Sequence, residues 1–179
     1  MRFQRLFAAF LALFLGFGTA AWAENNDDVS RLIDEGIKHH NNKNFILAVR
    51  SFKRALDLDP KNKELRSNLA IVHNNFGKYL SERTDNQGAL REFRHALYFD
   101  PSNETARENL EIKLEKVDLD PRDINVRVQE AQKERQAGNL YAAIAEVTEA
   151  NRIEESVNAY VEIGEINHVL FLKSGRQEK

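Results

Sequence analysis

The histidines are the residues of this sequence best suited to metal binding. His39 and His73 fall at equivalent places of an internal repeat, and His168 lies on a similar helical stretch. A zinc site needs ligands that converge within a few ångströms. Equivalent side chains of adjacent helical repeats lie about 20 Å apart, two helix diameters at the usual spacing, and the neighbours His39 and His40 diverge by about 100° on a helix. The spacing therefore predicts packing histidines and no metal site.

Acidic residues are numerous, yet their placement does not predict acid–base catalysis. Glycosidase chemistry needs two carboxylates that face each other across a cleft. Six acidic residues that could serve are expected on solvated faces or at helix starts, where the helix dipole favours them: Asp27, Asp28, Glu154, Glu155, Glu162 and Glu165. The sequence has no Gly-x-Ser-x-Gly elbow, no glycine-rich phosphate loop and no cysteine. We predict a non-catalytic protein without a cofactor.

Composition and charge narrow the class of protein. The chain has 179 residues, of which 42% are hydrophobic, with 26 Lys and Arg against 28 Asp and Glu, a net charge of −2. This balance fits an ordered protein of one domain or two small units and excludes a disordered chain. A nucleic-acid binder that relies on bulk positive charge is also excluded.

Residues 1–23 have the three parts of a secretory signal peptide. Arg2 and Arg5 precede a 12-residue apolar run over 6–17, and Ala21-Trp22-Ala23 supplies the small residues before a cleavage point. Spanning a bilayer takes about 20 apolar residues, so the run is short for an anchor. We expect cleavage after Ala23 and export of residues 24–179 to a periplasm or secretory lumen, with no remaining membrane span.

An internal repeat dominates the rest of the chain. One block has alanines and a phenylalanine followed by proline, at offsets 0, 4, 7 and 12: Ala48, Phe52, Ala55 and Pro60. A second block has the same residues at the same offsets: Ala89, Phe93, Ala96 and Pro101. A third, weaker block is Ala143, Val147 and Ala150. Steps of four and three keep residues on one helical face, and Asp-Pro ends a helix, so each block predicts the second helix of a hairpin.

With these positions the chain resembles the tetratricopeptide repeat family. Counted from Val29, the signature positions of the 34-residue unit hold Leu32, Gly36, Phe45, Ala48, Phe52, Ala55 and Pro60. The resemblance implies an all-α fold, a right-handed α-solenoid of helical hairpins. The repeats cover 29–62, 63–103 and 124–157.

Departures from the 34-residue spacing predict one lengthened helix and one additional helix. Ala48 and Ala89 are 41 residues apart, and the seven extra residues make about two helical turns of a longer first helix that turns at 84–86. The longer step from Ala89 to Ala143 leaves room for a helix over 104–117, which would cap the first two repeats as a unit over 24–117.

The remaining segments complete this organisation. We expect 118–123 to join that unit to 124–173, which holds the third repeat and a capping helix, and 174–179 to be a polar tail. An unbroken solenoid with one degenerate repeat remains the alternative.

The resemblance also implies a concave groove lined by the first helix of each repeat. Carried over by position, the predicted peptide-binding residues are Ile33, Ile37, His40, Asn41, Asn68, Ile71, Asn74, Asn75 and Ile112. Ile33 and Ile37 stand where some relatives hold a peptide carboxylate with Lys and Asn, so that clamp is absent. The isoleucines either form an apolar binding stripe or belong to the core.

These features favour a non-catalytic exported module or adaptor that binds a peptide or protein partner in the cell envelope. The alternative is a self-assembling structural protein, a homo-oligomer.

Overall fold

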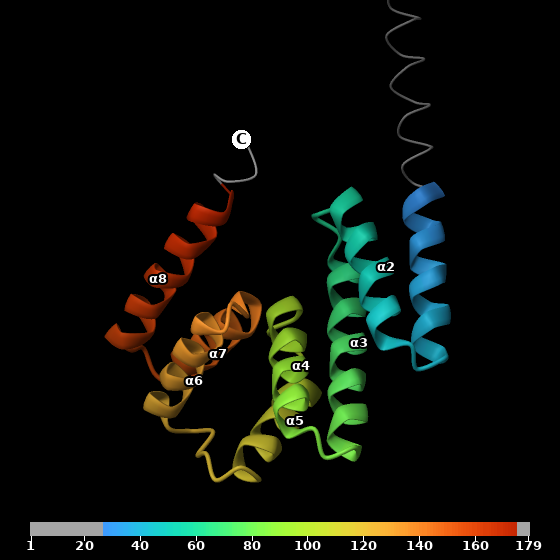
Figure 1. Cartoon of the computed structure of the whole chain (residues 1–179). Helices are drawn as coiled ribbons and strands as arrows, with labels where there is room; N and C mark the ends of the chain where they lie inside the picture. The colour runs from blue at the N-terminus through green and yellow to red at the C-terminus, as the bar shows by residue number, and fades with distance from the viewer. Residues whose placement is uncertain (1–26, 175–179) are drawn as a thin grey trace, which may run out of the picture. The chain divides into compact units, whose positions relative to one another are not determined.

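The computed structural model describes residues 27–174, which form helices joined by turns and contain no strand (Figure 1). The first helix is described over 27–41. It is followed by α2 (Phe45–Leu58), α3 (Lys63–Glu82), α4 (Asn86–Phe99), α5 (Glu104–Glu115), α6 (Ile124–Gln136), α7 (Leu140–Ile153) and α8 (Val157–Ser174). The predicted all-α class is confirmed. The predicted signal peptide and residues 175–179 of the predicted polar tail lie outside the described residues, and Ser174, expected in that tail, ends α8.

The chain divides into two compact units, Met1–Leu65 and Arg66–Lys179. The division falls within α3, and the predicted joint at 118–123 lies inside the second unit. No helix of the described part is long and apolar enough to cross a membrane.

The repeated small residues are the core contacts of the hairpins. Ala48, Ala55, Ala89 and Ala96 are fully buried, as are the third block's Ala143 and Ala150. The aromatic of each strong block packs against a glycine of the preceding helix: a Cβ on Gly36 would lie 2.7 Å from the Phe52 ring, and one on Gly77 would lie 2.6 Å from the Phe93 ring. The absence of a side chain at these glycines lets the phenylalanine approach the helix backbone.

The three hairpins turn in the same way. The residue two after each first helix has positive φ: Lys43 (59°), Thr84 (61°) and Gly138 (82°). The next residue in each case donates its backbone N–H to a carbonyl five residues back: Asn44 to His39, Asp85 to Leu80 and Asn139 to Glu134. This is the left-handed cap that closes a helix end. Glycine is the residue that adopts this conformation most readily, as Gly138 does, and Lys43 and Thr84 adopt it without glycine.

In the second unit the starts of α4, α5 and α6 are fixed by side-chain caps. Asp85 accepts from the Gly88 N–H at 2.9 Å, Asn103 from the Ala106 N–H at 3.0 Å, and Asp123 from the Asn125 N–H at 2.8 Å. Each cap satisfies one of the N–H groups that a helix leaves unpaired at its start.

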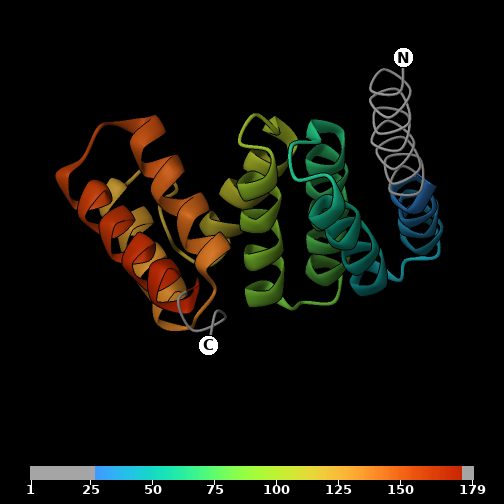
Figure 2. The same cartoon turned by 90° about the horizontal axis from the view of Figure 1, so that it is seen from above.

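The last three helices, α6, α7 and α8, pack on one another (Figure 2). Ala131, Ala143, Val147 and Ile166 form their buried cluster. Glu162 is also buried here, at 2% exposure, and pairs with the Arg135 guanidinium at 2.5 Å. The prediction that Glu162 lies on a solvated face is therefore wrong, because its partner comes from another helix, 27 residues away.

Candidate protein-binding surface

In the first unit, the predicted binding residues lie on the helix described over 27–41. Ile33 is half-buried, whereas Ile37 is 45% exposed and Asn41 is exposed. The His40 ring meets the Phe45 ring edge-on, with centroids 5.8 Å apart, which holds the end of this helix against α2. Ile37 is thus the apolar side chain that this helix presents to solvent.

In the second unit, two isoleucines occupy the same place on two helices. Ile71 is the ninth residue of α3 and is 45% exposed; Ile112 is the ninth residue of α5 and is 50% exposed. Ile37 is likewise the ninth residue counted from Val29. Three helices therefore leave an isoleucine about half exposed at the same position, which a core residue would not be. The ninth residue of α6 is Gln132 instead.

An amide pair connects the two helices beside these isoleucines. Asn109 of α5 donates its amide hydrogen to the Asn74 side-chain oxygen of α3 at 2.9 Å. Asn74 is buried at 7% exposure, so its side-chain oxygen holds the Asn109 amide from within the protein. Asn68 and Asn75 are partly buried. We call Ile71, Asn75, Asn109 and Ile112 the α3–α5 face; within each helix its members are three or four residues apart and lie on one side.

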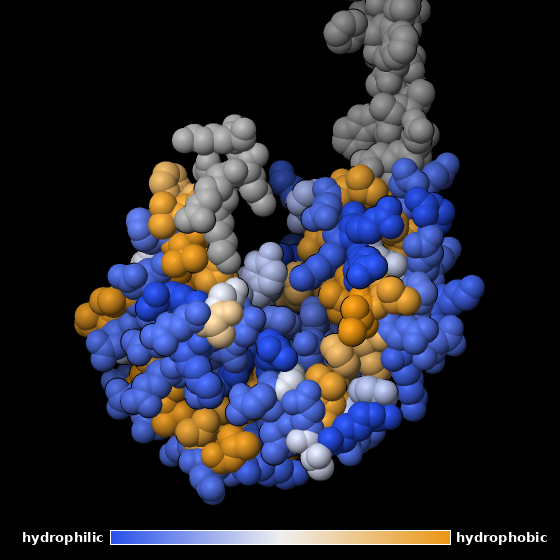
Figure 3. All heavy atoms as spheres, viewed as in Figure 1, coloured by the Kyte–Doolittle hydropathy of each residue, from blue (hydrophilic) through white to orange (hydrophobic). Residues whose placement is uncertain are grey.

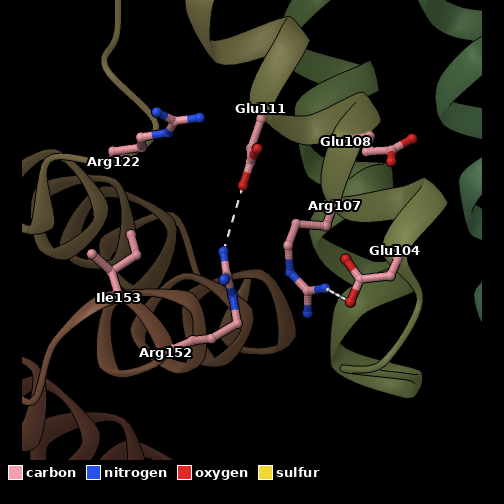
Figure 4. A pocket seen from close by; sticks show the side chains of 7 residues that line it. All are labelled: Glu104, Arg107, Glu108, Glu111, Arg122, Arg152 and Ile153. Carbon is pink, nitrogen blue, oxygen red and sulfur yellow. Dashed lines mark hydrogen bonds and ion pairs between the residues drawn. The ribbon is translucent and has the colours of Figure 1, made fainter.

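A polar cavity of about 450 Å³ lies on another side of α5 (Figure 4). Its walls are Glu104, Arg107, Glu108, Glu111, Arg122, Arg152 and Ile153. Arg107 pairs with Glu104, and Arg152 with Glu111 at 3.5 Å. Among the described residues, the structure gives the Arg122 guanidinium and the Glu108 carboxylate no ion pair, so both remain available to a ligand. This cavity could not be predicted from the sequence, because its walls come from α5, α7 and the turn before α6.

A buried ionic network holds α4, α6 and α7 together. The fully buried Arg94 guanidinium binds three carboxylates, Glu130 at 2.7 Å, Glu134 at 2.6 Å and Glu146 at 2.5 Å. Arg127, also fully buried, binds Glu146 at 2.9 Å. Burial alone would raise the pKa of Glu146, but Arg94 and Arg127 together lower it.

A second ion pair joins α5 to α7. The Arg107 guanidinium binds Glu149 at 2.9 Å, and the hydrogen bond to Glu149 raises the pKa of Arg107 against the effect of burial. Because Ile112 lies on α5 and Arg107 anchors that helix, this pair fixes one half of the α3–α5 face.

The final helix exposes a second set of apolar side chains. Val157, Tyr160, Val161, Phe171 and Leu172 of α8 are 44–78% exposed. Figure 3 shows apolar side chains reaching the surface along α8. Ile166, in contrast, is 1% exposed and packs on the α6–α7 hairpin. The helix therefore covers the hairpin with one side and leaves apolar groups on the other.

No protein-family model matches this chain, and no curated protein shows significant similarity to its sequence.

Proposed function

We propose that this protein is a non-catalytic, exported module of tetratricopeptide-like hairpins, arranged as a right-handed solenoid, that binds a peptide or protein partner. The observation that carries the proposal is the repeated exposure of one isoleucine: Ile37, Ile71 and Ile112 are 45%, 45% and 50% exposed at equivalent positions. A single exposed isoleucine would be ordinary, but its recurrence at one position of the repeat supports a recognition surface.

The apolar and amide side chains of the α3–α5 face indicate what kind of partner would bind there. Ile71 and Ile112 can bury apolar side chains, and the amides of Asn75 and Asn109 between them can both donate and accept hydrogen bonds. An apolar segment that presents backbone groups or a helical face fits this combination. Because the face itself carries no charge, we expect binding to depend weakly on salt.

The test is a selection from a random peptide library displayed on phage, followed by affinity measurement with one selected peptide. Ile71→Asp with Ile112→Asp should weaken binding by about a hundredfold or more, since each isoleucine contributes about 1.5–3 kcal/mol if fully buried and each 1.4 kcal/mol is tenfold. Fluorescence anisotropy of the labelled peptide gives the dissociation constants.

A matched control is Ile46→Asp, because Ile46 is 65% exposed on α2, a second helix of a hairpin. The control should bind within about twofold of wild type, and circular dichroism should show all variants folded. Unchanged binding by the double variant would contradict the proposal. Unfolding of the double variant would show that the isoleucines are core residues instead.

Export is a separate part of the proposal. The predicted cleavage leaves Glu24 as the first residue and removes Trp22, the only tryptophan. N-terminal sequencing of the protein from a periplasmic or secreted fraction should read from Glu24, and a protein there that begins at Met1 would contradict export by cleavage.

Self-association through α8 is the second candidate function, because Tyr160, Val161 and Phe171 are 54%, 60% and 73% exposed. Light scattering should then show a mass that grows with concentration in wild type and stays monomeric in Val161→Lys with Phe171→Lys. A monomer at all concentrations would contradict this candidate and leave the partner-binding proposal standing.

A further inference from the structure

Three metal-ligating side chains meet between α3 and α4. His73 comes from α3, and Glu92 and His95 come from α4, one helical turn apart. The His73 Nδ1 lies 2.7 Å from the Glu92 carboxylate, the His95 Nδ1 lies 3.9 Å from the same oxygen, and all three ligand atoms fall within 4.8 Å of one another. By its position in the sequence, His73 is the equivalent of His39 in the neighbouring repeat. In the structure His73 lies instead beside Glu92 and His95 of α4.

These separations suit a single ion. Zinc bonds of about 2.0–2.2 Å in tetrahedral geometry place neighbouring ligand atoms about 3.3 Å apart. The observed 2.7 and 3.9 Å separations lie on either side of that value, so small side-chain rotations bring the three groups to one centre. Two imidazoles and a carboxylate are a ligand set for zinc and its neighbours among the divalent transition metals, and not for magnesium or calcium, which take oxygen ligands.

The surroundings hold the ligands in place and shield them from water. The side chains of His73, Glu92 and His95 are 5%, 12% and 20% exposed. The His73 ring stacks on Phe99, with centroids 5.5 Å apart and planes 9° apart.

One ligand of the three borders a cavity. His95 lines a space of about 350 Å³ together with Gly138, Asn139, Leu140, Tyr141 and Leu170. The Tyr141 ring meets His95 edge-on, with centroids 6.4 Å apart. Because His95 borders this cavity, a water molecule or a side chain of another molecule could complete the coordination of an ion from that side.

We infer that His73, Glu92 and His95 form a binding site for one divalent transition-metal ion of the zinc class, with an open coordination position beside Tyr141. Such a site would tie α3 to α4 in the hairpin that carries Ile71. A merely structural His73–Glu92 hydrogen bond is the competing explanation, and it predicts no affinity for metal.

The test is titration of the protein, purified without a histidine tag, with Zn²⁺ in a calorimeter and with Co²⁺ followed by visible absorption. Wild type should bind one ion per chain, and bound Co²⁺ should show the intense d–d bands of a four- or five-coordinate centre. Excess Mg²⁺ should not displace the bound Co²⁺. His95→Ala should weaken Zn²⁺ binding by at least about tenfold, by analogy with the losses seen even when outer-shell partners of a metal site are removed.

His168→Ala is the matched control, since His168 is exposed on α8. It should bind Zn²⁺ as wild type does. Zn²⁺ should also raise the unfolding temperature of wild type and of His168→Ala, and should raise that of His95→Ala by less at the same Zn²⁺ concentration. The proposal is overturned if wild type binds no Zn²⁺, or if His95→Ala retains wild-type affinity, or if both variants lose binding equally.

Discussion

At the scale of residues, the hairpins repeat one contact between a small residue and a larger one. Gly36 faces Phe52 and Gly77 faces Phe93, and in each pair the larger residue follows by 16 positions. The third hairpin has Ala131 and Val147 at the same separation, both within its buried cluster. Alanine replaces glycine on the first helix and valine replaces phenylalanine on the second, so the packed volume of the pair stays similar.

Gly77→Ala should destabilise the protein by about 1–3 kcal/mol, because the added Cβ would lie 2.6 Å from the Phe93 ring. Gly164→Ala is the control: a Cβ on Gly164, within α8, meets nothing within 4 Å. That change should stabilise the protein by about 0.5–1 kcal/mol through helix propensity. Urea denaturation measures both, and destabilisation by Gly164→Ala of the same size would show that the loss is not due to the Phe93 contact.

The sequence predicted apolar core residues well and buried charges poorly. Ala48, Phe52 and Ala55 recur at offsets that one face of a helix explains, so their burial could be read from the spacing. The spacing carries no such signal for Arg94, whose partners Glu130 and Glu146 lie 36 and 52 residues away. A charged residue is expected on the surface when only the sequence is known, because the partner that stabilises it in the interior lies far away along the chain.

The ionic network predicts how stability changes with pH. The pKa of Glu146 in the folded protein lies below its ordinary value of 4.5 because Arg94 and Arg127 outweigh the effect of burial. A lowered folded pKa contributes stability that is fully present above about pH 4.5 and is lost as the pH falls through the folded value. Urea midpoints measured from pH 6 downward should therefore fall in wild type.

Glu146→Gln should show less of this acid-induced loss than wild type. It should also be less stable at pH 7, by about 3–5 kcal/mol, because the buried Arg127 loses the carboxylate that it binds, whereas Arg94 keeps Glu130 and Glu134. Equal acid dependence in the two proteins would show that other carboxylates cause the loss.

At the scale of elements, helices and their lengths followed from the spacing. The seven extra residues between the first two repeats lengthen a first helix, as predicted: α3 has 20 residues. The expected additional helix is α5, Glu104–Glu115. The sequence could not predict the polar cavity beside α5, since that depends on where the turn at Arg122 and the end of α7 are placed.

The repeated turn gives a prediction about single residues within it. Thr84 is β-branched and has a φ of 61°, a conformation that L residues resist and glycine adopts freely. Thr84→Gly should stabilise the protein by about 0.5–1 kcal/mol. Gly138→Ala, at a φ of 82°, should destabilise it by about 1 kcal/mol. Thermal unfolding of the two variants checks the signs, and a loss of stability in Thr84→Gly would contradict this account of the turn.

At the scale of the whole molecule, two compact units each carry at least one exposed isoleucine of the repeated position. The sequence could indicate which helices carry the proposed binding surface, because equivalent positions follow from the repeat. It could not show that Asn74 is buried or that Asn109 binds it, since that contact joins residues 35 apart. The sequence gives no indication of the identity of the proposed partner beyond the apolar and amide side chains of the α3–α5 face.

Amide hydrogen exchange with and without a selected peptide tests the binding claim most directly. A partner on the α3–α5 face should slow exchange in Lys63–Glu82 and Glu104–Glu115, around Ile71 and Ile112, and leave α2 and α8 unchanged. Slowing confined to α8, or to α2 around Ile46, would contradict the claim that the repeated isoleucines are where this protein binds its partner.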